Sequence, residues 1–223
     1  MIDRRPDVIV RPAGADDIRR AVTFARENDL PVSIKGGGHN VAGSAVGAHG
    51  LMLDCSGLKN VHVDHERRVA VAGAGALLAD LDGATQAHGL ATPLGVVSVT
   101  GIAGLTLGGG IGWLNGKHGL ACDNVLAADI VTSDGRLLTA SPDQHADLYW
   151  AIRGGGGNFG VVTSFTYRLH PVRQVLAGAL SFPADRTREV LMVYPEVAAS
   201  CPDELSMSAS LGCDASGRPV FGV

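Results

Sequence analysis

The clustering of glycine constrains this chain more than any other feature of its sequence. Of the 223 residues, 31 are glycine, about twice the usual share of ~7%. They gather at 36–38, 108–110 and 154–157 and follow no collagen-like period. Because glycine has no Cβ atom, it fits where the backbone approaches another group closely or adopts positive φ. Three such places in one chain indicate a large ligand that is contacted by several loops.

Composition and charge exclude several classes of function. Hydrophobic residues make up 46% of the chain, which is enough for one large domain or a domain and a half. The formal net charge is −4 and the charges are interspersed, so no basic stripe predicts a nucleic-acid partner. The four cysteines show neither CxxC spacing nor matching histidine pairs. We therefore expect reduced thiols and no metal site.

One uncharged segment has the length of a membrane span. Residues 90–116 contain no Asp, Glu, Lys or Arg, which meets the length test for a span. Seven glycines between Gly95 and Gly112, together with Pro93, would make a poor helix. We predict loop and short strand packed against a buried ligand, and no membrane association.

The start of the chain is charged. Residues 1–5 read MIDRR and do not resemble a signal peptide, which favours a cytoplasmic location. The same residues resemble the inside of a leader, so we expect a fragment or misplaced ends.

The hydrophobic pattern predicts strands and helices in mixed order over residues 1–172. Strands are expected at 8–10, 31–34, 51–53, 61–63, 68–72, 125–132, 137–138 and 161–169. In the last of these, alternation places Val161, Thr163, Phe165, Tyr167 and Leu169 on one side. A helix capped by Asp16 or Asp17 is expected, with Ile18, Ala21, Val22 and Ala25 on its apolar face, and further helices are expected at 76–88 and 143–152.

The pattern changes after Pro171. A strand candidate at 175–182 and a helix candidate at 185–197 follow. We therefore predict an α+β chain with a first domain at 1–172 and the beginning of a second, truncated domain at 173–223.

The first glycine cluster directly follows a predicted strand and reads KGGGHN at 35–40. Such a turn aims backbone N–H groups at phosphate, and Lys35 can add a point charge. The P-loop pattern GxxxxGK[ST] is absent, and in GAGALL at 73–78 a leucine stands where the dinucleotide fingerprint needs its third glycine. Two interpretations stay open: a less common phosphate loop, or a structural turn. His39 is likewise either a turn residue or a group beside a cofactor.

Four sequence blocks occur in a specific order. They are KGGGHNVAG at 35–43, PLGVVSVTGIAGLTLGGGIGWL at 93–114, HGLACDNVLAADIVTSDG at 118–135 and DLYWAIRGGGGNFGVVTSF at 147–165. Together they resemble the flavin domain of the FAD-binding PCMH-type oxidoreductases, the vanillyl-alcohol oxidase and berberine-bridge-like family. The group in which one histidine tethers the flavin, such as 6-hydroxynicotine oxidase, is the most similar. The resemblance implies an FAD-binding domain of two α/β subdomains, followed by the start of an incomplete α+β substrate domain.

The resemblance also implies a set of cofactor-binding residues. In the first loop, Gly36, Gly37, Gly38 and Asn40 would hold the FAD pyrophosphate, flanked by Lys35 and Gly43, and His39 would be bonded to the flavin 8α-methyl group. The second block would line the dinucleotide through Gly95, Thr100, Gly101, Gly104, Gly108, Gly109, Gly110 and Gly112. The backbone of Val161 and Val162 would meet the adenine or the ring system.

Departures from the family pattern are informative. Val97 stands where members with a second flavin bond, to the C6 atom, carry cysteine, so one covalent link through His39 is predicted. Lys35 replaces the usual arginine, which loses a planar fork but keeps the charge. His118 stands where tyrosine is common.

The implied function is that of an FAD-dependent oxidase or dehydrogenase. It would accept hydride from an alcohol, sugar or amine C–H of a small molecule onto flavin N5, with molecular oxygen or another electron acceptor as partner. Alternatives are a truncated flavin-binding module that is inactive by itself, and a nicotinamide-type dehydrogenase built on GAGALL. In this family the catalytic base sits mainly on the second domain, so no catalytic residue is nominated.

Overall fold

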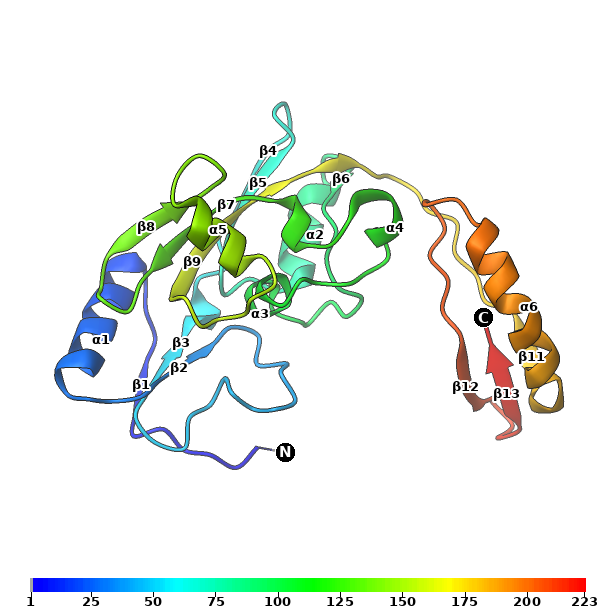
Figure 1. Cartoon of the computed structure of the whole chain (residues 1–223), viewed down its shortest axis with the longest axis horizontal. Coiled ribbons are helices and arrows are strands. Elements are labelled where there is room, and N and C mark those ends of the chain that lie inside the picture. The colour runs from blue at the N-terminus through cyan, green and yellow to red at the C-terminus, as the bar shows by residue number, and fades with distance from the viewer. Residues whose placement is uncertain (1) are drawn as a thin grey trace. The chain divides into compact units, whose positions relative to one another are not determined.

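The computed structural model of the protein describes residues 2–223. The chain divides into two compact units, Met1–Arg173 and Gln174–Val223. Helices and sheets alternate along the first unit (Figure 1), which confirms the predicted mixture of helix and sheet. That the second unit begins a substrate domain stays a prediction.

A three-stranded parallel sheet forms the N-terminal part of the first unit. Its strand order is β1 (Val8–Val10), β3 (Leu51–Asp54) and β2 (Val32–Lys35). Helix α1 (Ala15–Glu27) connects β1 to β2. The helix buries its predicted apolar face, made of Ile18, Ala21, Val22 and Ala25. All four residues of the central strand are buried, as expected for a parallel strand covered on both faces.

The start of α1 differs from the prediction. Its N-cap is Gly14 in an extended conformation, and no side chain caps the helix. Asp16 and Asp17 lie within the first turn, where carboxylates complement the positive end of the helix dipole. The Asp17 carboxylate accepts a hydrogen bond from the Ala13 N–H at 2.8 Å. The predicted cap at Asp16 or Asp17 is therefore wrong by two or three positions.

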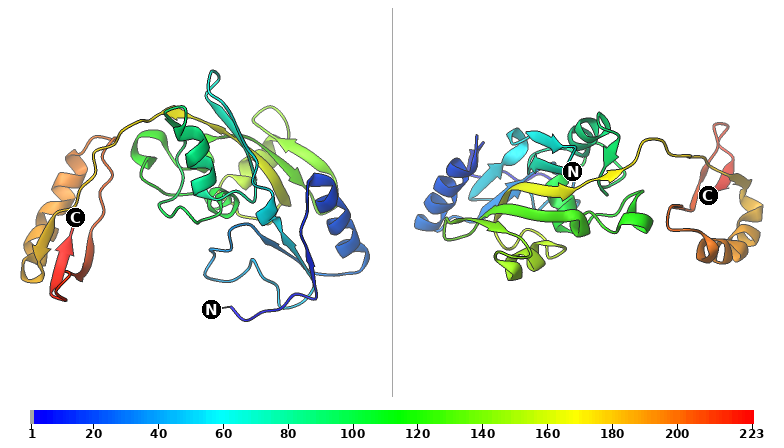
Figure 2. Two further views of the ribbon diagram at one scale, coloured as in Figure 1. Left: turned by 180° about the vertical axis from the view of Figure 1, so that it is seen from behind. Right: turned by 90° about the horizontal axis from the view of Figure 1, so that it is seen from above.

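A five-stranded antiparallel sheet forms the larger part of the first unit and is seen from three sides in Figures 1 and 2. Its strand order is β4-β5-β9-β7-β8. The strands are β4 (Val61–Asp64), β5 (Val69–Gly73), β7 (Val125–Val131), β8 (Leu137–Ala140) and β9 (Val161–Arg168). All five occur where the sequence predicts strands, to within a residue or two.

A bulge in β9 breaks the predicted alternation. Asp129 pairs with Ser164 and Ile130 pairs with Val162, which leaves Thr163 as an extra residue on β9. An extra residue reverses the direction of the side chains beyond it. Val161 consequently packs in the core cluster around α1, whereas Phe165 belongs to the larger core cluster. The prediction that Val161 shares a face with Phe165 is therefore wrong.

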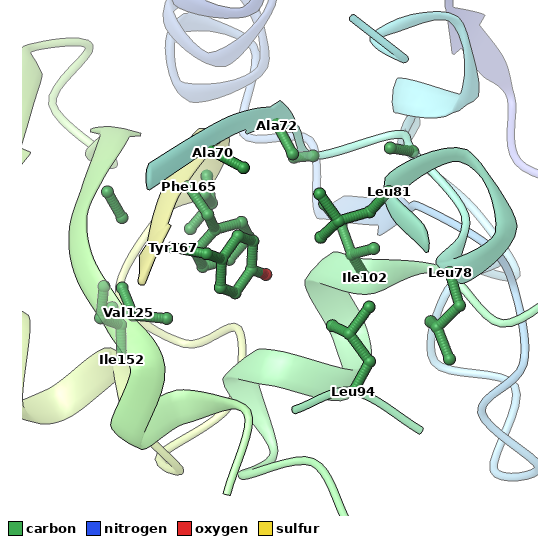
Figure 3. Close-up of a cluster of buried hydrophobic side chains, with 14 of the residues drawn as sticks. Ala70, Ala72, Leu78, Leu81, Leu94, Ile102, Val125, Ile152, Phe165 and Tyr167 are labelled. Carbon is green, nitrogen blue, oxygen red and sulfur yellow. The ribbon is translucent and has the colours of Figure 1, made fainter. Parts of the chain in front are cut away.

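The larger core cluster lies between the antiparallel sheet and two helices, α2 (Leu78–Gln86) and α3 (Ile102–Leu107). Figure 3 shows Phe165 and Tyr167 projecting from β9 toward Ile102 of α3. The Tyr167 hydroxyl lies 2.8 Å from the Thr106 hydroxyl, and both residues are buried. Burial raises the pKa of Tyr167 above its ordinary value, so the phenol stays neutral and holds α3 to the sheet.

The uncharged segment at 90–116 contains more helix than predicted. It includes β6 (Leu90–Ala91), α3 and the start of α4 (Asn115–His118). Helix α3 forms because Gly101 and Gly108 lie at its two caps, and only one glycine falls inside it. Its buried residues Ile102 and Thr106 are four positions apart, on one helical face. No helix within residues 2–223 is both long enough and apolar enough to cross a membrane.

The two remaining predicted elements of the first unit are shorter than expected. Helix α2 starts at Leu78 rather than at residue 76. Helix α5 (Ala146–Ile152) starts three residues later than predicted, because Ser141 and Gln144 form a bridged turn before it. Strand β10 (His170–Pro171) pairs with β6. Single turns of 3-10 helix occur at Cys55–Gly57 and Cys122–Asn124.

The second unit is a small antiparallel sheet with one helix. The strands are ordered β11 (Ser181–Pro183), β13 (Pro219–Gly222) and β12 (Ser210–Cys213). Helix α6 (Thr187–Ser200) follows a 3-10 turn at Ala184–Arg186. The predicted strand at 175–182 is reduced to its end, because residues 174–180 form no regular element.

The hydroxyl pair of Tyr167 and Thr106 can be tested by substitution. We expect Tyr167→Phe to lower the free energy of unfolding by about 1 kcal/mol, because it leaves a buried hydroxyl without this partner. Urea unfolding followed by circular dichroism measures the change. The double variant Tyr167→Phe/Thr106→Val should lose less than the sum of the single variants, since neither polar group remains. Strictly additive losses would show that the two hydroxyls do not interact.

Candidate functional site: a glycine-lined cleft

A cleft of about 620 Å³ lies in the first unit and is lined mainly by backbone and small side chains. It brings together segments that are distant in sequence: the end of β2 with its loop, the start of α3, and the loop before β9. More than half of the predicted site residues line it, namely Gly36, Gly37, Gly38, His39, Asn40, Thr100, Gly101, Gly104, Gly108 and Val162.

The loop after β2 presents free backbone donors. The N–H groups of Gly37, Gly38, His39 and Asn40 make no hydrogen bond to any part of the chain that the structure describes. Gly38 has φ of +71°, a conformation that L-residues rarely adopt. Beyond the histidine, the Asn40 side chain accepts a hydrogen bond from the Ala42 N–H at 2.9 Å and closes the turn. The loop therefore offers a row of donors that suits an anionic group.

The wall of the cleft depends on direct backbone contact between Gly37 and Gly101. A Cβ atom on either glycine would overlap the backbone nitrogen of the other. This contact joins the loop after β2 to the N-cap of α3. A side chain at either position would push the two segments apart.

The inner surface of the cleft is apolar. Cys55, Ala74 and Val162 line it and are buried. Burial, with a smaller effect of the nearby Asp54 carboxylate, raises the pKa of the Cys55 thiol to about 11. Cys55 is therefore a neutral thiol and contributes no charge to the cleft near neutral pH.

Lys35 does not line the cleft. Its Nζ atom lies 3.2 and 3.3 Å from the two carboxylate oxygens of Asp54, which is 6% exposed. Burial alone would raise the pKa of Asp54, but hydrogen bonds from Ser56 and the Lys35 ammonium outweigh it and lower the pKa below its ordinary value. Lys35, which was expected to act as a point charge for the phosphate, is thus paired with the buried Asp54 carboxylate on the neighbouring strand β3.

Several predicted glycines serve the fold instead of lining the cleft. A Cβ on Gly112 would overlap the Leu94 carbonyl oxygen, and one on Gly110 would lie 2.5 Å from the Ala121 Cβ. Gly43 is buried against the side chain of Ile2. Gly95, Gly109 and Val161 also lie outside the lining, and Val161 belongs to the core around α1.

The sequence analysis missed one wall of the cleft. Gly156, Gly157, Asn158 and Gly160 line it from the loop before β9. The glycine cluster at 154–157 carries the signal that could have found this wall, since clustered glycine indicates a place of close approach. The other lining residues give no comparable signal, because ordinary small and apolar residues do not indicate a binding site. They include Ser33, Ile34, Ser44, Ala45 and residues of α3.

The residues of the cleft fit FAD. An extended dinucleotide needs donors for its pyrophosphate, room beside the backbone and apolar surface for its rings. The free N–H groups, the glycine-lined space of the cleft and the buried apolar residues supply these three. Residues 2–223 contain no cluster of three or more His, Cys, Asp or Glu side chains that could hold a metal ion.

The geometry defines a dinucleotide-binding domain with a glycine-lined cleft, and comparison with known proteins identifies its family. Residues 6–141 match the model of the FAD binding domain family. An FAD-linked oxidoreductase of Dictyostelium discoideum is 39% identical over 208 residues, which cover 92% of this chain and 46% of that protein. The (R)-6-hydroxynicotine oxidase of Paenarthrobacter nicotinovorans is 38% identical over 180 residues, covering 80% of this chain and 39% of that protein.

Solved structures show the same fold. The 6-hydroxy-D-nicotine oxidase of Arthrobacter nicotinovorans superposes with a TM-score of 0.93 at 33% identity, over 99% of this chain and 49% of that one. A berberine bridge enzyme variant superposes with a TM-score of 0.87 at 26% identity, over 96% of this chain and 44% of that one. The chain belongs to the PCMH-type FAD-binding family of FAD-linked oxidoreductases, and it spans less than half the length of these relatives.

The Gly37–Gly101 contact predicts opposite effects of two alanine substitutions. Gly101→Ala should lower the free energy of unfolding by about 1–3 kcal/mol, because the methyl group forces the loop and α3 apart. Gly104→Ala is the matched control: a Cβ there meets nothing within 4 Å, and alanine is the better helix former by ~1 kcal/mol. Thermal and urea unfolding of the cofactor-free chain measure both. Equal stability of the two variants would contradict the contact.

The environment of the cysteines predicts their order of reaction. At pH 8, a thiol with a pKa of about 11 is ionised in roughly one molecule in a thousand, and the thiolate is the reactive form. We expect Cys55 to resist alkylation while the exposed Cys213 reacts first, as measured by peptide mass mapping of the folded chain. A Cys213→Ser variant should lose the fast phase. Modification of Cys55 as fast as Cys213 would show that the cleft surface is open and wet.

Proposed function

We propose that this chain is the flavin-binding part of an oxidoreductase that removes hydride from an alcohol, sugar or amine C–H of a small molecule. FAD would lie in the cleft with its pyrophosphate on the loop Gly36–Asn40 and its flavin anchored by His39. The observation that carries this proposal is the row of free backbone donors at Gly37–Asn40 beside the Gly37–Gly101 contact.

The loop can hold a pyrophosphate without a cationic side chain. Four consecutive N–H groups supply the hydrogen bonds, and glycines leave room for the phosphate oxygens. Lys35 would attract the pyrophosphate only weakly, because its ammonium group is paired with the Asp54 carboxylate. Membership of the family supports FAD as the dinucleotide.

The position of His39 supports a covalent anchor. His39 is exposed, lines the cleft and makes no hydrogen bond to the described part of the chain, so its ring nitrogens are available for bonding. The glucooligosaccharide oxidase of Acremonium strictum, which is 28% identical to this chain, has a 6-S-cysteinyl, 8α-N1-histidyl FAD. By the family motif, His39 would supply the histidyl bond, and Val97 leaves no thiol for the cysteinyl bond.

The electron balance of the anchor requires an oxidant. Replacing one C–H bond of the 8α-methyl group by a C–N bond releases two electrons and two protons, one proton coming from the imidazole. Molecular oxygen or another electron acceptor would take these electrons. Once bound, FAD supplies the hydride acceptor, and the chain's own contribution is to bind and orient it.

The isolated chain provides a second candidate function, that of a flavin-binding module without turnover. The observation in its favour is that the chain spans 46% or less of the curated relatives named above. A nicotinamide-type dehydrogenase built on residues 73–78 is not proposed. Gly73 and Gly75 pack directly against the backbone of the segment 55–58 and do not line the cleft. A cytoplasmic location stays a prediction from the sequence.

The anchor predicts a mass change that depends on one residue. After expression with FAD and denaturation, the chain should carry an added mass near that of FAD, and His39→Ala should lose it. His49→Ala is the control, because His49 is an exposed histidine nearby that does not line the cleft. Intact-mass spectrometry and the visible flavin spectrum give the readouts. A yellow chain without added mass would overturn the anchor alone, whereas a colourless chain that refuses FAD would overturn the proposed function.

A further inference from the structure

His118 belongs to a side-chain cluster that lies outside the cleft lining. His118 ends α4, and its ring stacks on the His170 ring of β10 with centroids 3.9 Å apart and planes 17° apart. The Nε2 atom of His170 lies 2.7 Å from the Oδ1 atom of Asn124. The cluster therefore joins three segments: the end of α4, the 3-10 turn at Cys122–Asn124, and β10.

Asn124 is the centre of this cluster. It is 2% exposed, and its Nδ2 atom donates to the carbonyl oxygens of His118 at 2.8 Å and Leu120 at 2.9 Å. Because the amide nitrogen has two acceptors, the amide orientation is fixed and Oδ1 must accept from His170. The Nδ2 atom thus holds the segment 118–122 in one conformation, and the Oδ1 atom joins Asn124 to His170 of β10.

The segment held by Asn124 in turn supports the cleft. The N–H groups of Ala121 and Cys122 donate to the carbonyl oxygens of Gly110 at 3.0 Å and Gly109 at 2.9 Å. Both glycines have positive φ, +82° and +105° respectively. The preceding residue, Gly108, lines the cleft. Hydrogen bonds therefore link the segment that Asn124 holds to Gly109 and Gly110, the two residues that follow Gly108 of the cleft wall.

We propose that Asn124 is a positioning residue for the cofactor cleft, an inference that rests on the proposed function. Its amide fixes residues 118–122, and these fix Gly108–Gly110 in the conformation that receives FAD. Without the amide, two partly buried carbonyls and the imidazole of His170 lose this partner. The segment then becomes mobile, and FAD has to order it on binding, which weakens the affinity.

A second brace keeps the segment from unfolding when Asn124 is changed. Arg153 donates through Nε to the Cys122 carbonyl at 2.8 Å and lies 3.1 Å from the Asp123 carboxylate. This contact comes from the residue after α5 and does not involve Asn124. Substitution of the amide should therefore loosen the segment and leave the rest of the unit folded.

Hydrogen exchange and FAD titration of the chain test the proposal together. All variants carry His39→Ala, which keeps FAD binding reversible. We expect Asn124→Ala to speed amide exchange at Ala121 and Cys122 at least tenfold without FAD, and to raise the dissociation constant for FAD about tenfold. His170→Phe retains a ring for the stack but loses the Nε2 donor to Asn124, so about threefold changes in the same direction are expected.

Thr85→Val is the matched control. Thr85 is buried to a similar degree and donates its hydroxyl to the Leu81 carbonyl at 3.0 Å within α2, away from the cleft lining. It should lower the melting temperature without changing exchange at Ala121 and Cys122 or FAD affinity.

Each outcome of this experiment bears on the proposal. Unchanged exchange or unchanged FAD affinity in both cluster variants overturns it, as does an equal loss of FAD affinity in Thr85→Val, because general destabilisation would then explain the effect. If Asn124→Ala does not fold, the result for His170→Phe decides. If FAD binds neither to the His39→Ala parent nor to the chain with His39 intact, the proposed function is contradicted instead, and exchange at Ala121 and Cys122 still shows whether Asn124 fixes the segment.

Discussion

The cleft depends on the contact of two backbones. Gly37 follows a strand of the parallel sheet, and Gly101 precedes a helix packed on the antiparallel sheet. Their main chains touch with no side chain between them. A Cβ atom at either position would lie 2.3–2.4 Å from the backbone nitrogen of the other residue, so one of the two segments would have to shift. The cleft wall therefore exists because two positions far apart in sequence both lack a Cβ atom.

The cleft contains little side-chain charge. The cation at the end of β2, Lys35, is paired with the buried Asp54, which ties β2 to β3. The apolar inner surface contains a thiol that stays neutral. In the proposed function, recognition of the pyrophosphate would thus depend on main-chain dipoles, which do not titrate.

The sequence predicted the architecture well where local signals were strong. The spacing of apolar residues along the sequence was enough to predict the apolar stripe of α1 and the five strands of the antiparallel sheet. The cleft was harder, because a glycine required by a ligand and a glycine required by the protein's own backbone look identical in sequence. Gly36 and Gly38 line the cleft, whereas Gly110 and Gly112 accommodate Ala121 and Leu94. Only the tertiary structure separates the two kinds.

The bulge at Thr163 was beyond prediction for a related reason. An extra residue in a strand leaves no mark in the hydrophobic pattern when, like Thr163, it lies between a valine and a serine, Val162 and Ser164. Its effect is that β9 gives Val161 to the core around α1 and Val162 to the core beneath the antiparallel sheet. One strand is thereby shared by two hydrophobic cores. Unfolding of either core would remove packing from a strand on which the other core also depends, so we expect the two halves of this unit to lose their structure in a single cooperative transition.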